Sequence, residues 1–217
     1  MAKPTLIIGN RNYSSWSLRA WLALEATRLD FDEVIVPLGR PETEAEILRW
    51  SPSARVPAFV DGDLHLWDSL AICEHLAESH PQAGLWPADA RARATARSVV
   101  AEMHSGFVPL RKHMPMNLRA SYHGAGREPG VEEDIERITK IWEECRTNFG
   151  AGGDLLFGSF TMADAFYAPI VSRFRTYGVA PRGAAGDYMD AVWALPSMQD
   201  WAAKAHAEPW QVARYDR

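Results

Sequence analysis

A serine-rich turn near the N-terminus carries the clearest chemical signal in this sequence. It lies between a short apolar stretch and a segment with helical spacing, and it reads Tyr13-Ser14-Ser15-Trp16-Ser17-Leu18-Arg19. Hydroxyl groups and unpaired backbone amides at the start of a helix can hold an anion. Serines in this position usually cap the helix, so the turn predicts a helix cap, an anion site or both.

Two further motifs place polar groups at the ends of elements. Asp68 and Ser69 directly precede an apolar helical run, where carboxylate acceptors and backbone amide donors occur together. Val56 precedes Pro57, and a cis bond there would turn the backbone polar groups of Val56 toward a ligand. A trans proline that starts an edge strand is the commoner arrangement, so the pattern leaves the two open.

Composition and charge narrow the class of protein. The chain has 217 residues, 47% of them hydrophobic, and a formal net charge of −5, which favours a globular fold and disfavours a nucleic-acid partner. No stretch approaches the roughly 20 apolar residues of a membrane helix, and no signal peptide is recognised, so we expect a cytoplasmic protein without a membrane partner. Cys73 and Cys145 are far apart and the histidines lack ligand spacing, so no metal site is expected.

The first third of the chain alternates strand and helix patterns. Apolar β-branched runs predict strands, and three- and four-residue apolar spacing predicts helices. Asp61-Gly62-Asp63 predicts a tight hairpin. The order β-α-β-α-β-β-α is typical of a thioredoxin-like domain, with expected strands 5–8, 33–36, 56–60 and 64–67 and expected helices from 14, at 42–50 and at 70–78.

The remainder of the chain shows helical patterns only. We expect a thioredoxin-like domain over 1–82, a linker over 83–89 that contains Gly84 and Pro87, and an all-helical domain over 90–217. Thr161 and Asp164 have the spacing of a capping box at a helix start. The helices expected in this second domain are 90–114, 131–149, 162–177 and 197–206.

Four motifs in this order resemble those of the cytosolic glutathione transferases: the serine turn, Arg55-Val56-Pro57, Asp68-Ser69-Leu70-Ala71-Ile72 and 157–164. The run Ser14–Arg19 is most similar to the zeta-class pattern Ser-Ser-Cys-Ser-Trp-Arg, a class that includes maleylacetoacetate isomerases, with Trp16 where that class has cysteine. The resemblance implies a thioredoxin-like domain followed by an all-helical domain. It also implies glutathione as co-substrate, a small-molecule electrophile and a homodimer.

The resemblance further implies a catalytic role for the serine turn. Such an enzyme converts the glutathione thiol, with a free pKa near 8.5, into a thiolate near neutral pH. Lowering the pKa by one or two units requires about 1.4 to 2.7 kcal/mol of preferential stabilisation of the anion. Ser14 is the first candidate donor, Ser15 is an alternate, and Tyr13 competes because other classes use a tyrosine hydroxyl from this loop.

Binding roles for the remaining motifs follow from the same resemblance. Val56 would hydrogen-bond the cysteinyl unit of glutathione beside Pro57, while Asp68 and Ser69 would take the γ-glutamyl ammonium and carboxylate. Candidate partners of the glycyl carboxylate are Arg40 and Arg55. For the electrophile, helical spacing on the first long helix of the second domain selects His104, Phe107, Val108, Arg111 and Met114.

Three functions are consistent with these motifs, and they differ in class. The first is thiol conjugation to an electrophile, activated at Ser14. The second is glutathione-dependent cis-trans isomerisation of the maleylacetoacetate type, in which glutathione is not consumed. The third is a non-catalytic glutathione-binding scaffold. A thiol-disulfide oxidoreductase is disfavoured because Ser14 and Ser17 occupy the redox positions.

Overall fold

The computed structural model describes residues 3–216, and its N-terminal part is built on a four-stranded mixed sheet of strand order β2-β1-β3-β4. β1 runs parallel to β2, whereas β3 pairs antiparallel with both β1 and β4. Along each strand, successive side chains point to opposite faces of the sheet. The strands are β1 (Thr5–Ile8), β2 (Asp32–Ile35), β3 (Ala58–Asp61) and β4 (Leu64–Trp67).

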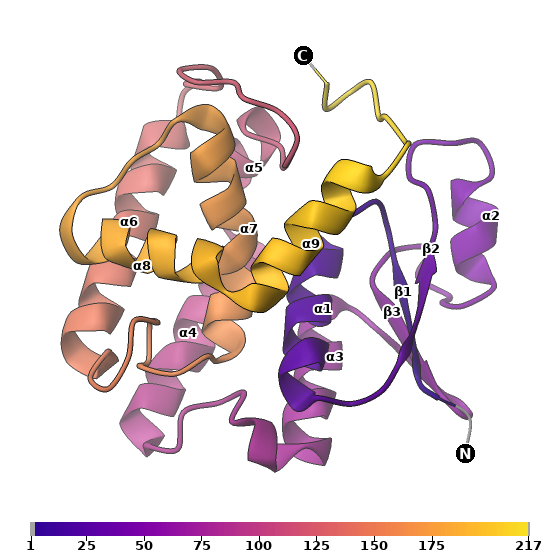
Figure 1. Cartoon of the computed structure of the whole chain (residues 1–217), viewed down its shortest axis with the longest axis horizontal. Coiled ribbons are helices and arrows are strands. Elements are labelled where there is room, and N and C mark those ends of the chain that lie inside the picture. The colour runs from indigo at the N-terminus through magenta and orange to yellow at the C-terminus, as the bar shows by residue number, and fades with distance from the viewer. Residues whose placement is uncertain (1–2, 217) are drawn as a thin grey trace.

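Helices cover both faces of this sheet. Leu6 and Ile8 of β1 face α1 (Ser15–Thr27) and α3 (Ser69–Ser79), within the large core that continues into the helical part. Ile7 points the other way and packs in a small cluster with α2 (Thr43–Leu48). Figure 1 shows α2 on the outer side of the sheet and α1 between the sheet and the remaining helices. The thioredoxin-like arrangement expected from the sequence is therefore confirmed.

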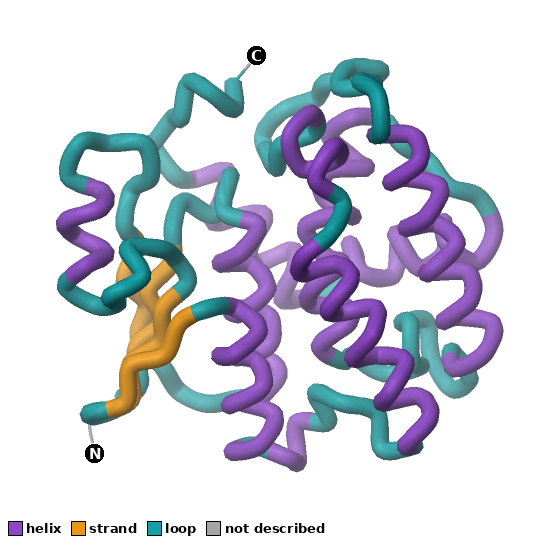
Figure 2. Tube along the Cα trace, turned by 180° about the vertical axis from the view of Figure 1, so that it is seen from behind, coloured by secondary structure: helices purple, strands orange, loops and turns teal. Residues whose placement is uncertain are grey.

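The rest of the chain is helical, as expected, and packs against α1. α7 is central: nearly all of its residues are buried, because it contacts α1, α4 and α8. Figure 2 shows the sheet on one side of the molecule and, apart from α2, the helices on the other. After the short η1 (Pro81–Ala83), the helices are α4 (Ala90–Ser105), α5 (Val108–His113), α6 (Val131–Phe149), α7 (Met162–Tyr177), α8 (Gly183–Ala194) and α9 (Pro196–Ala207).

Two expectations for the helical part were wrong. The single helix expected over 90–114 is interrupted, because Phe107 adopts a left-handed backbone with φ of 59° between α4 and α5. α8 was not expected at all, since Gly183 and Gly186 weaken a helical pattern. Gly186 is required by close packing: a Cβ there would lie 2.5 Å from the carbonyl oxygen of Pro181.

The capping box expected at the start of α7 is confirmed. Asp164 is fully buried, and its carboxylate accepts hydrogen bonds from the amide of Thr161 (2.8 Å) and the amide of Leu156 (3.2 Å). Burial raises the pKa of Asp164 to about 6, against the lowering effect of these hydrogen bonds. The carboxylate thus joins the loop before α7 to the helix that carries much of the core.

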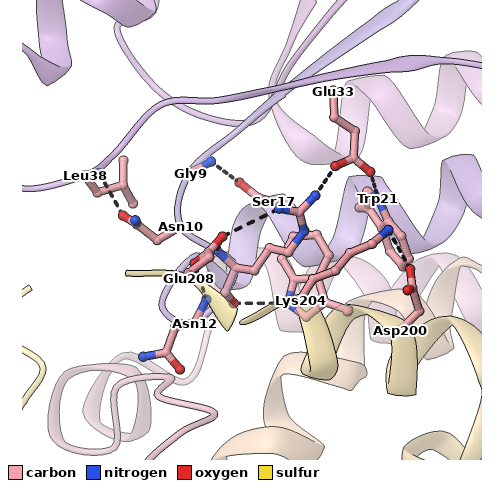
Figure 3. Close-up of polar contacts among 12 residues, drawn as sticks. Gly9, Asn10, Asn12, Ser17, Trp21, Glu33, Leu38, Asp200, Lys204 and Glu208 are labelled. Atoms are coloured by element: carbon pink, nitrogen blue, oxygen red, sulfur yellow. Dashed lines mark hydrogen bonds and ion pairs between the residues drawn. The ribbon is translucent and has the colours of Figure 1, made fainter. Parts of the chain in front are cut away.

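A buried arginine links three separate segments of the fold. The guanidinium of Arg11, in the loop after β1, pairs with Glu33 of β2 and lies 3.6 Å from Glu208, which follows α9. The amide of Arg11 also donates to Glu208 (2.9 Å), and Trp201 donates to the carbonyl of Arg11 (3.0 Å). Glu33 and Glu208 lie in one continuous polar network with the loop (Figure 3).

We expect Glu208→Ala to destabilise the fold by about 2–4 kcal/mol, because it leaves a buried guanidinium and a buried amide short of an acceptor. Urea unfolding measures this loss. The matched control is Asp200→Ala, which removes an exposed carboxylate that pairs with Lys204 one turn further along α9, and we expect a change below about 0.5 kcal/mol. Equal effects of the two substitutions would contradict this account of Arg11.

We also expect Asp164 to make stability depend on pH. Its folded pKa of about 6 lies above the value near 3.9 of an unfolded aspartate, so its contribution is full below about pH 4 and is lost as the pH rises to about 6. Asp164→Asn should remove this part of the profile. Unfolding free energies of both proteins across this range measure the difference, and parallel profiles would refute it.

Candidate functional site

A cavity of about 680 Å³ opens where the N-terminal end of α1, the start of α3 and the helical part meet. It brings together most of the residues that the sequence selected, although they come from distant segments. The predicted residues that line it are Tyr13, Ser14, Ser15, Arg55, Val56, Pro57, Asp68, Ser69 and Arg111. Arg40, His104, Phe107, Val108 and Met114 lie outside the lining.

Ser14 is the N-cap of α1, and its hydroxyl is the most informative group in the cavity. Its Oγ accepts from the amide of Ser17 (3.3 Å) and lies 2.7 Å from Ser17 Oγ. Ser17 Oγ in turn accepts from the amide of Gly9 (3.0 Å), as Figure 3 shows. If Ser17 donates its one hydrogen to Ser14 Oγ, that oxygen accepts two hydrogen bonds. The hydrogen of Ser14 is then left to donate into the cavity.

Tyr13 also borders the cavity, but its hydroxyl faces the C-terminal segment. The hydroxyl donates to the Asp216 carboxylate (2.9 Å) and accepts from Arg119 (3.0 Å) and the amide of Val212 (3.3 Å). The ring packs against Tyr215, with centroids 5.6 Å apart. The phenolic hydrogen is therefore already committed to a carboxylate in this arrangement.

The two remaining polar motifs also line the cavity. The Val56-Pro57 bond is cis, and Val56 lies before the first residue of β3. Asp68 caps α3 through the amide of Leu70 (2.7 Å). The buried hydroxyl of Ser69 has no hydrogen-bond partner among residues 3–216. A buried hydroxyl without a partner in the chain is suited to a ligand that supplies one.

The expected electrophile residues are dispersed, because the break after α4 changes the direction of the chain. Met114 is fully buried, Phe107 is buried, and Val108 is 63% exposed. His104 stays on α4 and lies 3.5 Å from the Asp68 carboxylate through Nε2, with a pKa lowered chiefly by burial. Arg111 alone of this group reaches the cavity, while Arg40 lies in an exposed loop where its amide donates to Thr43.

Several residues that shape the cavity were not among the candidates selected from the sequence. The ring of Trp16 contacts two guanidinium groups, with Arg19 4.4 Å and Arg111 5.0 Å from its centroid. Arg173 reaches the lining from α7, and Arg214 and Tyr215 reach it from the C-terminal segment. Arg173 follows the apolar run 162–171 on the same predicted helix. It could have drawn attention, since a charge on a buried helix requires a reason.

Burial lowers the pKa of Arg19 to about 9 and that of Arg173 to about 10, and the two groups also repel each other and Arg111. They remain cations at neutral pH.

Across residues 3–216 there is no group of three or more histidine, cysteine or acidic side chains placed to hold a metal ion. In the same described range, no helix is long and apolar enough to cross a membrane.

The fold combines a mixed thioredoxin-like sheet with a helical second half, and a serine that caps a helix lines the cavity between them. These features define a class of two-part transferase folds. Comparison with known proteins agrees: residues 13–79 match the model of the glutathione S-transferase N-terminal domain, and residues 128–203 match that of the C-terminal domain. The chain belongs to the glutathione S-transferase family.

Relatives of this chain carry two kinds of name. It is 30% identical over 173 residues to a probable maleylacetoacetate isomerase of Caenorhabditis elegans, covering 78% of each chain. It is 34% identical to a zeta-class glutathione S-transferase of Euphorbia esula, covering 77% of this chain and 75% of that one. A glutathione transferase homologue from Burkholderia, solved with bound glutathione, superposes with a TM-score of 0.69 at 25% identity, covering 94% of this chain and 98% of the other.

Both cysteines should be inert in the folded protein. Cys73 and Cys145 are buried and unpaired, and burial raises the pKa of each thiol, that of Cys145 to about 12. Because the thiolate is the reactive form, we expect an aromatic disulfide reagent to label neither in native protein and both after denaturation. Labelling of Cys73 at native rates typical of exposed thiols would contradict the burial described here.

Proposed function

We propose that the chain is a serine-type glutathione transferase in which the Ser14 hydroxyl donates to the glutathione sulfur and stabilises the thiolate. The observation that carries this proposal is the chain of contacts from the Gly9 amide through Ser17 Oγ to Ser14 Oγ at the cavity. With Ser17 as the donor to Ser14, the Ser14 hydrogen is left for the sulfur. The family membership of the chain supports the co-substrate. The proposed domain limits are those expected above, 1–82 and 90–217.

The rest of glutathione fits the polar groups around Ser14. The backbone groups of Val56, before the cis Pro57, suit the cysteinyl amide, which needs one donor and one acceptor. The unpartnered hydroxyl of Ser69, at the start of α3, suits the γ-glutamyl carboxylate. Asp68 suits the γ-glutamyl ammonium, and Arg55 at the rim suits the glycyl carboxylate.

The energy that this chemistry requires is modest. A bound thiol with a pKa one to two units below 8.5 needs about 1.4 to 2.7 kcal/mol of preferential stabilisation of the anion. A hydrogen bond from a hydroxyl to a charged acceptor supplies about 1.5 to 3 kcal/mol. The N-terminal end of α1 carries a partial positive charge, which also favours the thiolate. Ser14 and the helix together therefore meet the requirement.

Isomerisation is the second candidate function, and one observation favours it. The relative from Caenorhabditis elegans that aligns with this chain over 78% of its length is named a probable maleylacetoacetate isomerase. Addition of the thiolate to a double bond, rotation and loss of glutathione would use the same site. Trp16, where the zeta class has cysteine, distinguishes this chain from that class.

We further propose a homodimer in the cytoplasm, and light scattering of the purified chain tests the oligomeric state.

The first test is the ultraviolet absorbance of the thiolate of bound glutathione as the pH is varied. We expect a bound-thiol pKa one to two units below the free value of about 8.5, and a return toward that value in Ser14→Ala. Tyr13→Phe is the matched control, since it also removes one hydroxyl from the loop but leaves the Ser14 hydrogen bonds in place. We expect its thiol pKa to stay low.

Other outcomes would redirect the assignment. A loss confined to Tyr13→Phe would move the catalytic role by one residue and would mean that Tyr13 leaves Asp216 when glutathione binds. Binding with an unshifted thiol, or no binding, would favour the scaffold. Conversion of a cis double-bond substrate without consumption of glutathione would select the isomerase.

A further inference from the structure

Arg173 joins the helical half of the molecule to the start of α1 inside the cavity. It belongs to α7, is 5% exposed, and lines the cavity with its guanidinium. One nitrogen, Nη2, donates to Ser15 Oγ (3.2 Å), and Nη1 donates to the carbonyl of Met114 (2.5 Å). Its Nε has no hydrogen-bond partner among residues 3–216. A nearly buried cation therefore contacts the hydroxyl beside Ser14.

The positive charge of Arg173 is not balanced by an acidic side chain. None of the ion pairs formed by residues 3–216 includes Arg19, Arg111 or Arg173. The groups that face Arg173 are Arg19 on α1, Arg111 on α5, Tyr177 on its own helix and Tyr215 in the C-terminal segment, and none is a carboxylate. Asp68 and Asp134 act on Arg19 and Arg111 instead. Burying a cation without a counter-charge costs several kcal/mol, so stability does not explain the burial of Arg173.

The contact with Ser15 gives this charge a direction. A hydroxyl has two acceptor lone pairs and a single hydrogen. Because Arg173 donates to Ser15 Oγ, it occupies a lone pair and leaves the hydrogen of Ser15 available. Ser15 also lines the cavity and follows Ser14 in the first turn of α1. Ser14 and Ser15 can then both donate to one anion placed at this helix end.

We propose, resting on the function proposed above, that Arg173 is a positioning residue for the glutathione thiolate. It holds Ser15 with its hydrogen directed to the sulfur, and its charge favours the thiolate over the thiol. The anion that compensates the buried charge of Arg173 is in this account the reacting sulfur itself. The helical half, which the sequence linked only to the electrophile, thereby contributes to activation of glutathione.

The test compares Arg173→Met with Arg173→Lys. The methionine variant removes the charge and the donor but keeps an unbranched apolar stem, so it should fold, whereas the lysine variant keeps the charge. We expect the bound-thiol pKa to rise by about one unit in Arg173→Met and by less in Arg173→Lys. The rate of conjugation to 1-chloro-2,4-dinitrobenzene, at a fixed pH at least one unit below the wild-type bound-thiol pKa, should fall about tenfold in Arg173→Met, since one pKa unit there is one decade in thiolate.

Arg175→Met is the matched control. Arg175 lies two residues further on the same helix but is partly exposed and pairs with Asp190 (3.9 Å), so its loss should leave the thiol pKa unchanged. S-Methylglutathione, which has no ionisable thiol, should bind all four proteins equally, and this shows that the peptide site is intact. Circular dichroism and melting temperature confirm folding of each variant.

The outcomes separate this inference from the proposed function. If the wild type lowers the thiol pKa and Arg173→Met lowers it equally, the inference is wrong and the transferase assignment stands. Equal rises in Arg173→Met and Arg173→Lys would overturn the role of the charge. If the wild type itself binds glutathione with an unshifted thiol, the proposed function fails first. A rise in Arg173→Met alone, with unchanged binding of S-methylglutathione, supports the inference.

Discussion

The ion pairs of Arg11 with Glu33 and Glu208 are the constraint on which the geometry of the site depends. The loop that carries Ser14 has no strand or helix of its own, so its position must come from contacts with other segments. Arg11 fixes it to β2 on one side and to the segment after α9 on the other. Asn12 adds a hydrogen bond to Asn117 (2.8 Å) in the helical half. The loop that carries Ser14 is therefore positioned by both halves of the chain together.

The same loop shows how backbone and side-chain polarity can be ordered for chemistry. Ser17 holds the amide of Gly9 at the end of β1 and contacts Ser14 at the start of α1. A strand end and a helix start are thus connected through two hydroxyls, and the helix contributes the partial positive charge of its N-terminus. Because each group has a partner, the serine needs little rearrangement to receive an anion, which is what makes a hydrogen bond useful in stabilising charge.

Positive charge at the junction of the two halves is unusually concentrated. Arg19 and Arg111 both contact the ring of Trp16, and the aromatic face offsets part of the cost of burying them. Trp16 occupies a position that is cysteine in the zeta class, so this chain uses the site for packing and cation contact instead of a thiol. The C-terminal segment closes one side of the cavity by holding Tyr13 through Asp216.

The sequence by itself determined the thioredoxin-like order of strands, the helical second half and the capping box of Thr161 and Asp164, because these depend on local periodicity and caps. Only the tertiary structure decided which side chains share the cavity. The turn at Phe107 moved Val108 and Met114 away from it, and packing of α7 on α1 brought Arg173 beside Ser15. Such contacts join residues 158 positions apart, and no local pattern records a pairing that arises only when separate helices pack.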